Sequence, residues 1–130
     1  MALNIEVKEI ANHSYIVDLN GSLDNESYSD LEMRFKKISH QCTKAVCLNM
    51  KRVSYISSAG IGVLVSERKL LSGYHALMAL VGLQPAVRKV FDLMKLSPIF
   101  LMLDELPRTD EEVNGLLTRY LGTPAAQAIH

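Results

Sequence analysis

Two adjacent serines, Ser57 and Ser58, have the best setting for chemistry in this chain. The run that contains them, VSYISSAGIGVL at 53–64, follows an apolar segment at 45–50 that predicts a strand buried on both faces. The run leads into apolar residues spaced along one face of a helix, which Gly73 is expected to end. The two serines are therefore predicted to lie where the carboxyl end of a strand meets the amino end of a helix.

Two roles suit a serine hydroxyl at such a junction. It can cap the helix by accepting a hydrogen bond from a backbone N–H one turn further on. It can also carry a phosphate, which would meet free N–H groups and the positive end of the helix dipole. The residue types favour the two roles about equally for Ser57 and Ser58. The nearby Gly60 and Gly62 allow close backbone approach, either of helix to sheet or of a partner to the helix.

Other kinds of site have little support in the sequence. Ser58 lacks the Gly-x-Ser-x-Gly frame of a nucleophile elbow, and the Gly-Ile-Gly at 60–62 is too short for a dinucleotide fingerprint. The central strand is expected to end at Asn49 and Met50, without the acid cluster of a phospho-receiver domain. The four histidines form no spaced ligand pair. We therefore expect no enzyme activity, no metal and no cofactor.

Composition narrows the class of protein. The chain has 130 residues, 48% of them hydrophobic, and a formal net charge of zero, which predicts one domain with a real core and neither nucleic acid nor a membrane surface as main partner. Without an apolar run of spanning length or a signal peptide, a cytosolic protein is expected. Cys42 and Cys47 should then be free thiols. We expect the domain to span residues 1–122, followed by a flexible tail at 123–130.

The elements that position the serines follow from the spacing of apolar residues. Strands are predicted over 5–8, 15–19, 45–50, 76–81 and 99–103, and helices with apolar faces spanning 28–38, 61–71, 87–94 and 113–121. Ser27 is a candidate N-cap, and Thr109 with Glu112 forms a capping box.

The resulting order, β-β-α-β-α-β-α-β-α, predicts an α/β fold with a mixed, mostly parallel sheet, an antiparallel first strand and about four helices. In such sheets functional groups gather outside the carboxyl ends of the strands. Both Asp24 and the Ser57-Ser58 pair are expected there.

The run at 53–64 resembles the signature of STAS domains, which occur in bacterial anti-sigma factor antagonists. In that family an apolar strand runs into Asp-Ser-Ser/Thr-Gly-Leu-Gly, and the sequence Gly-Ser-Leu-Asp at 21–24 is similar to an earlier Gly-x-Leu-Asp turn. The resemblance covers roughly residues 4–121. It implies the same β-β-α-β-α-β-α-β-α fold.

Carried over by position, Ser58 takes the place of the serine that is phosphorylated in the family. Ala59 takes the following Ser/Thr, and Gly60 takes the family glycine. Ser57 and Asn49 stand where the family often has aspartate, so these two departures remove acids that we expect near the site. Ser57 is the alternative phosphorylation site.

The resemblance implies that the protein switches partners. Unmodified, it would bind an anti-sigma factor that is also a serine kinase, through a surface made of Asp24, Ser57, Ser58, Ala59, Gly60 and Gly62. Phosphorylation would break this complex, and a PP2C-type phosphatase would restore it, with ATP bound by the kinase. The alternative is an unphosphorylated interaction module of the same fold, a signalling scaffold or a transporter accessory subunit, in which the serines only cap the helix.

Overall fold

The computed structural model describes residues 2–122 of the chain. The elements in chain order are β1 (Leu3–Ala11), β2 (Ser14–Leu23), α1 (Tyr28–Ile38), β3 (Ala45–Ile56), α2 (Ser58–Gly73), β4 (Leu77–Val81), α3 (Pro85–Leu93), a 3-10 turn (Ser97–Ile99), β5 (Leu101–Leu103) and α4 (Asp110–Leu121). The predicted order of strands and helices is confirmed, with the 3-10 turn added before the last strand. The tail predicted at 123–130 lies outside the described residues.

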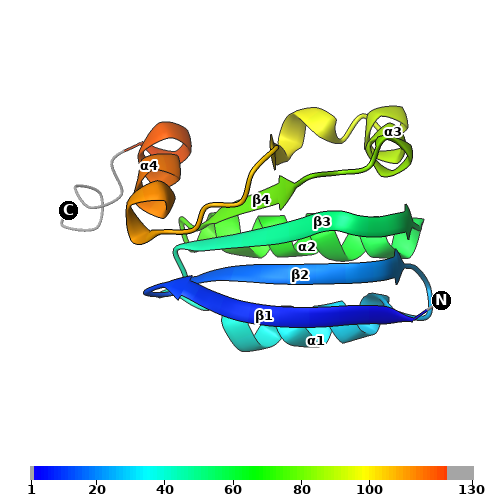
Figure 1. Cartoon of the computed structure of the whole chain (residues 1–130), viewed down its shortest axis with the longest axis horizontal. Coiled ribbons are helices and arrows are strands. Elements are labelled where there is room, and N and C mark those ends of the chain that lie inside the picture. The colour runs from blue at the N-terminus through cyan, green and yellow to red at the C-terminus, as the bar shows by residue number, and fades with distance from the viewer. Residues whose placement is uncertain (1, 123–130) are drawn as a thin grey trace.

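The strands form one sheet in the order β1-β2-β3-β4-β5 (Figure 1). The strand β1 runs antiparallel to β2, and the remaining neighbours are parallel. The predicted mixed, mostly parallel sheet is therefore confirmed. The register places Leu23 opposite Ile56, so β2 and β3 end side by side at the same edge.

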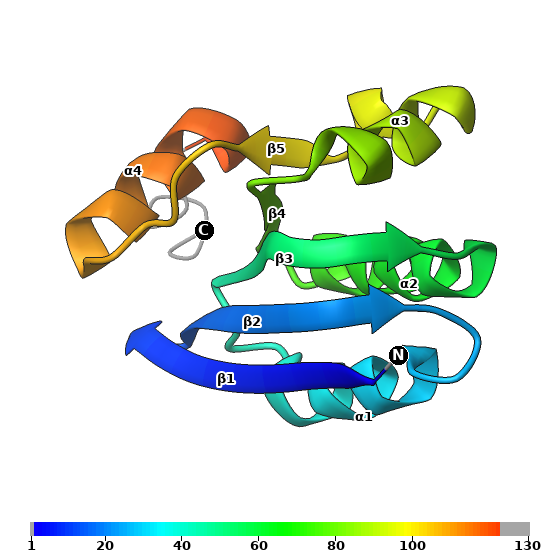
Figure 2. The ribbon, with the colours of Figure 1, turned by 45° about the vertical axis from the view of Figure 1, so that its right-hand side comes forward.

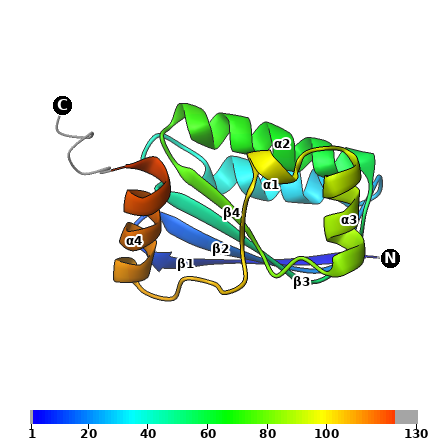
Figure 3. The same ribbon diagram turned by 90° about the horizontal axis from the view of Figure 1, so that it is seen from above.

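The two faces of the sheet are covered differently. Figure 3 shows α1 and α2 lying next to each other over one face, where they enclose the main core together with Val87 and Phe91 of α3. On the other face α4 packs through Val113 and Leu117 against Ala45, the first residue of β3, and against β4. No helix within residues 2–122 covers the rest of that face, on β1, β2 and β3 (Figure 2).

The central strand is longer than its apolar run predicts. Residues 45–50 were expected to form it, but β3 continues to Ile56. Its last residues pair with the long strand β2, although β4 stops at Val81, opposite Asn49. Because only one neighbour remains beyond Asn49, side chains such as Arg52 become exposed and the continuous apolar pattern ends before the strand does.

One further strand boundary and the burial of three residues differ from prediction. Pro98 lies inside a 3-10 turn, so the last strand begins at Leu101 rather than at 99. Three residues predicted on apolar helix faces, Tyr28, Met94 and Tyr120, are exposed by 36%, 47% and 44%. Tyr28 and Tyr120 lie in terminal turns of α1 and α4, and Met94 follows the last residue of α3.

Candidate functional site

The loops that follow β2 and β3 are held together at one edge of the sheet. The backbone N–H of Ser57 donates to the carbonyl of Leu23 at 2.9 Å, which continues the β2–β3 pairing into the loop. The Ser57 hydroxyl donates to Oδ1 of Asn25 at 3.2 Å. Asp24 and the serine pair therefore lie on neighbouring loops at the carboxyl ends of the strands, as the sequence predicts.

Ser57 caps helix α2. Its backbone is extended, with φ −98° and ψ 172°, and its Oγ accepts a hydrogen bond from Gly60 N–H at 3.2 Å. Its carbonyl accepts from Ile61 N–H at 2.9 Å. Because the same hydroxyl also donates to Asn25, both of its hydrogen-bonding functions are in use.

Ser58 is the first residue of α2 and differs from Ser57 in every respect that matters for modification. Its side chain is exposed, and its hydroxyl makes no hydrogen bond to any group within residues 2–122. The N–H groups of Ser58 and Ala59 belong to the first turn, where the helix offers no acceptor. An anion attached at Ser58 would therefore lie beside two free backbone donors.

The two glycines of this turn have separate roles. Gly60 is buried, and a Cβ at this position would lie 2.7 Å from both Cγ and the carbonyl oxygen of Leu23. Gly62 is exposed, and a Cβ there would meet no atom within 4 Å. Gly60 thus allows the helix to approach β2, whereas Gly62 keeps a flat, accessible surface one turn beyond Ser58.

The Asp24 carboxylate forms hydrogen bonds within its own loop. Its Oδ1 accepts hydrogen bonds from the backbone N–H of Glu26 at 3.0 Å and from that of Ser27 at 3.2 Å. The bond from Glu26, followed by the bonds from Ser27, lowers the pKa of the Asp24 carboxyl below its ordinary value. Asp24 therefore carries a negative charge beside the serine loop at neutral pH.

Ser27 stands at the predicted N-cap position of α1, but its side chain does not cap the helix. Its hydroxyl instead donates to the carbonyl of Ser22 at 2.7 Å and accepts from Asp24 N–H at 3.0 Å. The prediction of the helix start was correct and the predicted capping bond was wrong. The hydroxyl closes the turn between β2 and α1.

Asn49 lies far from the serine loop, contrary to expectation. It is in the middle of β3, seven residues before Ile56, a separation on the order of 20 Å along an extended strand. Its side-chain N–H donates to Oδ1 of Asp18 at 2.8 Å on the open face of the sheet. The absence of an acid at Asn49 therefore does not alter the charge around Ser58.

The sequence prediction missed one residue of this region and one buried carboxyl further along α2. Asn25, which accepts a hydrogen bond from the Ser57 hydroxyl, has no sequence signal beyond its place after Asp24. Glu67 of α2 is buried at 5% exposure and accepts a hydrogen bond from the Ser39 hydroxyl at the end of α1. Burial raises the pKa of the Glu67 carboxyl. Its spacing from Leu64 and Leu71, on the predicted apolar face, was the available signal.

The part of the chain that the structure describes holds neither a metal-ligand cluster nor a disulfide. No group of three or more His, Cys, Asp or Glu side chains there could hold a metal ion. Cys42 is exposed and Cys47 buried, both are free, and burial raises the pKa of the Cys47 thiol to about 12.

No helix within 2–122 is both long enough and apolar enough to cross a membrane.

Comparison with known proteins places this geometry in context. The family model described as STAS domain matches residues 4–113. A curated relative, the anti-sigma F factor antagonist of Paenibacillus polymyxa, is 27% identical over 117 residues, which cover 88% of this chain and 94% of the relative.

Two solved structures share the fold. The phosphorylated form of the Bacillus cell fate determinant SpoIIAA superposes with a TM-score of 0.65 at 19% identity, covering 87% of this chain and 99% of that one. An anti-sigma factor antagonist from Mycobacterium paratuberculosis gives a TM-score of 0.72 at 18% identity, covering 87% and 92%. At these identities the likeness establishes the arrangement of strands and helices.

Proposed function

The chain belongs to the STAS domain family, and from that premise we propose that it is an anti-sigma factor antagonist controlled by phosphorylation of Ser58. The name of the Paenibacillus polymyxa relative supports the antagonist role. The partner we propose is an anti-sigma factor with serine kinase activity. The kinase would supply the ATP site, and a PP2C-type phosphatase would reverse the modification.

The observation that carries this proposal is the contrast between two neighbouring hydroxyls. The Ser57 hydroxyl holds the start of α2 and the loop after β2, through Gly60 N–H and Asn25. The Ser58 hydroxyl is exposed and has no partner within residues 2–122. A kinase needs a hydroxyl that can enter its active site without breaking the fold, and this requirement favours Ser58 over Ser57.

A phosphate at Ser58 would be tolerated by the fold and harmful to a complex. It would add a charge of about −1.5 to −2 next to the positive end of α2, which stabilises anions. A partner that covers Ser58 closely would have to bury that charge. A loss of about 3 kcal/mol in binding free energy weakens a complex by roughly a hundredfold, which is enough for a switch.

The partner surface that we propose surrounds Ser58. Asp24, Ser57 and Ala59 lie beside it, and Gly62 leaves room for a partner to approach the first turns of α2. Gly60 is buried, so its contribution is to set the position of the helix against β2.

The central experiment incubates the protein with its kinase and ATP, followed by mass spectrometry and binding curves. We expect phosphate on Ser58 in the wild type and in Ser57→Ala, and none in Ser58→Ala. The Ser58→Asp variant should lose the kinase, because aspartate supplies part of the phosphate charge. Phosphate on Ser57 alone would move the switch by one residue. Unmodified serines, with all variants binding alike, would favour an unphosphorylated interaction module.

A pair of glycine variants tests the surface separately from the switch. Gly62→Arg should abolish partner binding while the free energy of unfolding stays within about 1 kcal/mol of wild type, because the site is open. The matched control is Gly73→Arg at the other end of α2, where a Cβ also meets no atom within 4 Å. If Gly62→Arg and Gly73→Arg bind the partner equally well, the surface is wrongly placed.

A further inference from the structure

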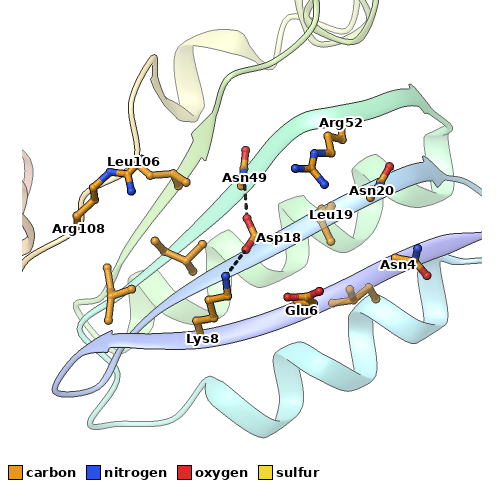
Figure 4. Close-up of a pocket in the computed structure, with 13 residues that line it drawn as sticks. Asn4, Glu6, Lys8, Asp18, Leu19, Asn20, Asn49, Arg52, Leu106 and Arg108 are labelled. Atoms are coloured by element: carbon orange, nitrogen blue, oxygen red, sulfur yellow. Dashed lines mark hydrogen bonds and ion pairs between the residues drawn. The ribbon is translucent and has the colours of Figure 1, made fainter.

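A polar hollow of about 780 Å³ lies on the open face of the sheet, away from the serine loop (Figure 4). Its lining comes from β1, β2, β3 and the segment between β5 and α4, and comprises Asn4, Ile5, Glu6, Lys8, Ile10, Ile16, Asp18, Leu19, Asn20, Asn49, Arg52, Leu106 and Arg108. The volume is within the range of small-molecule sites.

The floor of the hollow follows from strand register. Glu6 lies opposite Asp18, and Asp18 lies opposite Asn49. In the neighbouring row Asn20 lies opposite Arg52. Asn49 and Arg52 are three residues apart on β3, but the β2–β3 register shifts between Asp18 and Asn20, and this irregularity keeps Arg52 on the same face as Asn49. With the alternation of side chains along β1 and β2, the registers bring acids, amides and a guanidinium together on the face that lines the hollow.

Only some of the charged side chains in the hollow form ion pairs with other protein groups. Lys8 Nζ lies 3.7 Å from Asp18 Oδ2, and Asn49 donates to the other oxygen of the same carboxylate. Within residues 2–122 this is the one ion pair, so Glu6, Arg52 and Arg108 have no charged partner. Three basic side chains line the hollow against two acidic ones.

The two arginines reach toward the hollow from opposite sides. Figure 4 shows Arg52 extending from β3 toward Asn49, and Arg108 extending from the segment before α4. A solvated sheet face gains stability by placing opposite charges across from each other. Here two carboxylates, Glu6 and Asp18, are directly opposed, while the guanidiniums of Arg52 and Arg108 have no ion-pair partner within residues 2–122.

We propose that the hollow binds a small organic oxyanion, a carboxylate or a phosphate that also carries hydroxyl groups. A guanidinium presents a planar fork of N–H donors that matches either kind of oxyanion, and Arg52 and Arg108 would bind it. Glu6 would accept from the ligand's hydroxyls, and the amides of Asn20 and Asn49 would orient it. The hollow shares no residue with the surface around Ser58, so the proposal is independent of the partner switch.

The test is a titration of the full-length, ¹⁵N-labelled protein, followed by NMR, with two probes at constant ionic strength. Citrate represents the carboxylate source and glycerol 3-phosphate the phosphate source. We expect the side-chain signals of Asn20, Asn49 and Arg52 to shift and to saturate at millimolar concentrations of at least one probe. Saturation by one probe alone identifies the oxyanion.

Matched arginine variants decide whether the shifts report this site. Arg52→Gln and Arg108→Gln should each weaken binding by at least tenfold. Arg34→Gln should leave binding unchanged, because Arg34 is exposed on α1, over the opposite face of the sheet. Arg108 precedes α4 in a loop, so its variant keeps the test valid if Arg52→Gln fails to fold.

Three results would overturn the proposal. The first is the absence of saturable shifts with both probes. The second is saturable binding that is equally strong in Arg52→Gln, Arg108→Gln and the control Arg34→Gln. The third is a set of shifts confined to the backbone amides of Ser58 and Ala59, which would show an anion bound only at the start of α2.

Discussion

The junctions β2–α1 and β3–α2 use the same residue type at the same position for different purposes. Each places a serine at the N-cap of a helix that follows a parallel strand of the sheet. Ser57 has an extended backbone, ψ 172°, and its hydroxyl reaches forward to Gly60 N–H. Ser27 has ψ −14°, and its hydroxyl turns back to the carbonyl of Ser22. Backbone conformation, rather than residue type, therefore decides whether a serine caps its helix.

The two junctions also differ in whether they leave a serine hydroxyl free for modification. At β2–α1, Ser27 is 4% exposed and Oδ1 of Asp24 accepts from two backbone N–H groups, so the turn is closed on itself. At β3–α2 the cap is complete with Ser57, and Ser58 is exposed, with a hydroxyl that has no hydrogen-bond partner within residues 2–122. An exposed hydroxyl outside the cap is available for a switch.

The largest effect on stability should come from adding a side chain at Gly60 in the β3–α2 junction. Gly60→Ala places a Cβ 2.7 Å from the Leu23 backbone and should lower the free energy of unfolding by about 2–3 kcal/mol, the range for overpacking. The control Gly62→Ala meets no atom and should stabilise the helix by up to about 1 kcal/mol. Urea unfolding of both variants measures the difference. Equal midpoints would show that α2 does not depend on close approach to β2.

The next largest loss of stability should come from removing the Ser27 hydroxyl in the β2–α1 junction. Ser27→Ala leaves the Ser22 carbonyl and Asp24 N–H without their partner in a buried turn, a loss of about 2 kcal/mol. Chemical denaturation gives the value. A loss below that of Ser57→Ala would contradict the distinction between a closed turn and an ordinary cap.

A smaller effect is expected at the cap of α2. Ser57→Ala should cost about 1 kcal/mol, the usual value for a lost N-cap. Ser58→Ala, its adjacent control, should change stability by less than about 0.5 kcal/mol because its hydroxyl has no partner within 2–122. Thermal and urea unfolding compare the two. A larger loss at Ser58 would reverse their assigned roles.

The smallest effect is a difference in acid sensitivity between the junctions. The folded pKa of Asp24 is lowered, so its contribution to stability is present above the unfolded pKa and is lost as pH falls through the folded value. The second junction has no carboxyl among its capping groups. We expect the amide signals of Glu26 and Ser27 to shift on acidification in NMR spectra, and that of Gly60 to stay constant. Asp24→Asn should abolish the shift.

Much of the fold could be predicted from the local pattern. Alternating apolar residues identified the opening hairpin, and continuous apolar runs identified β3 and β4, because a strand buried on both faces has no polar side. The Thr109 cap was also correct, since Thr109 Oγ1 accepts from Glu112 N–H at 3.1 Å. The end of β3 was wrong because its last residues have one neighbouring strand, which the run itself cannot reveal.

The strand-to-helix junction that carries Ser57 and Ser58 could be predicted from the chain alone, because apolar spacing and glycines are local properties. The distinction between the two serines needs the three-dimensional arrangement, since the hydrogen bond of Ser57 to Asn25 depends on how β2 and β3 pair. That arrangement also moved Asn49 from the expected site to the open face of the sheet, beside Asp18. Strand register determines which distant residues meet, and residue order along one strand does not contain that information.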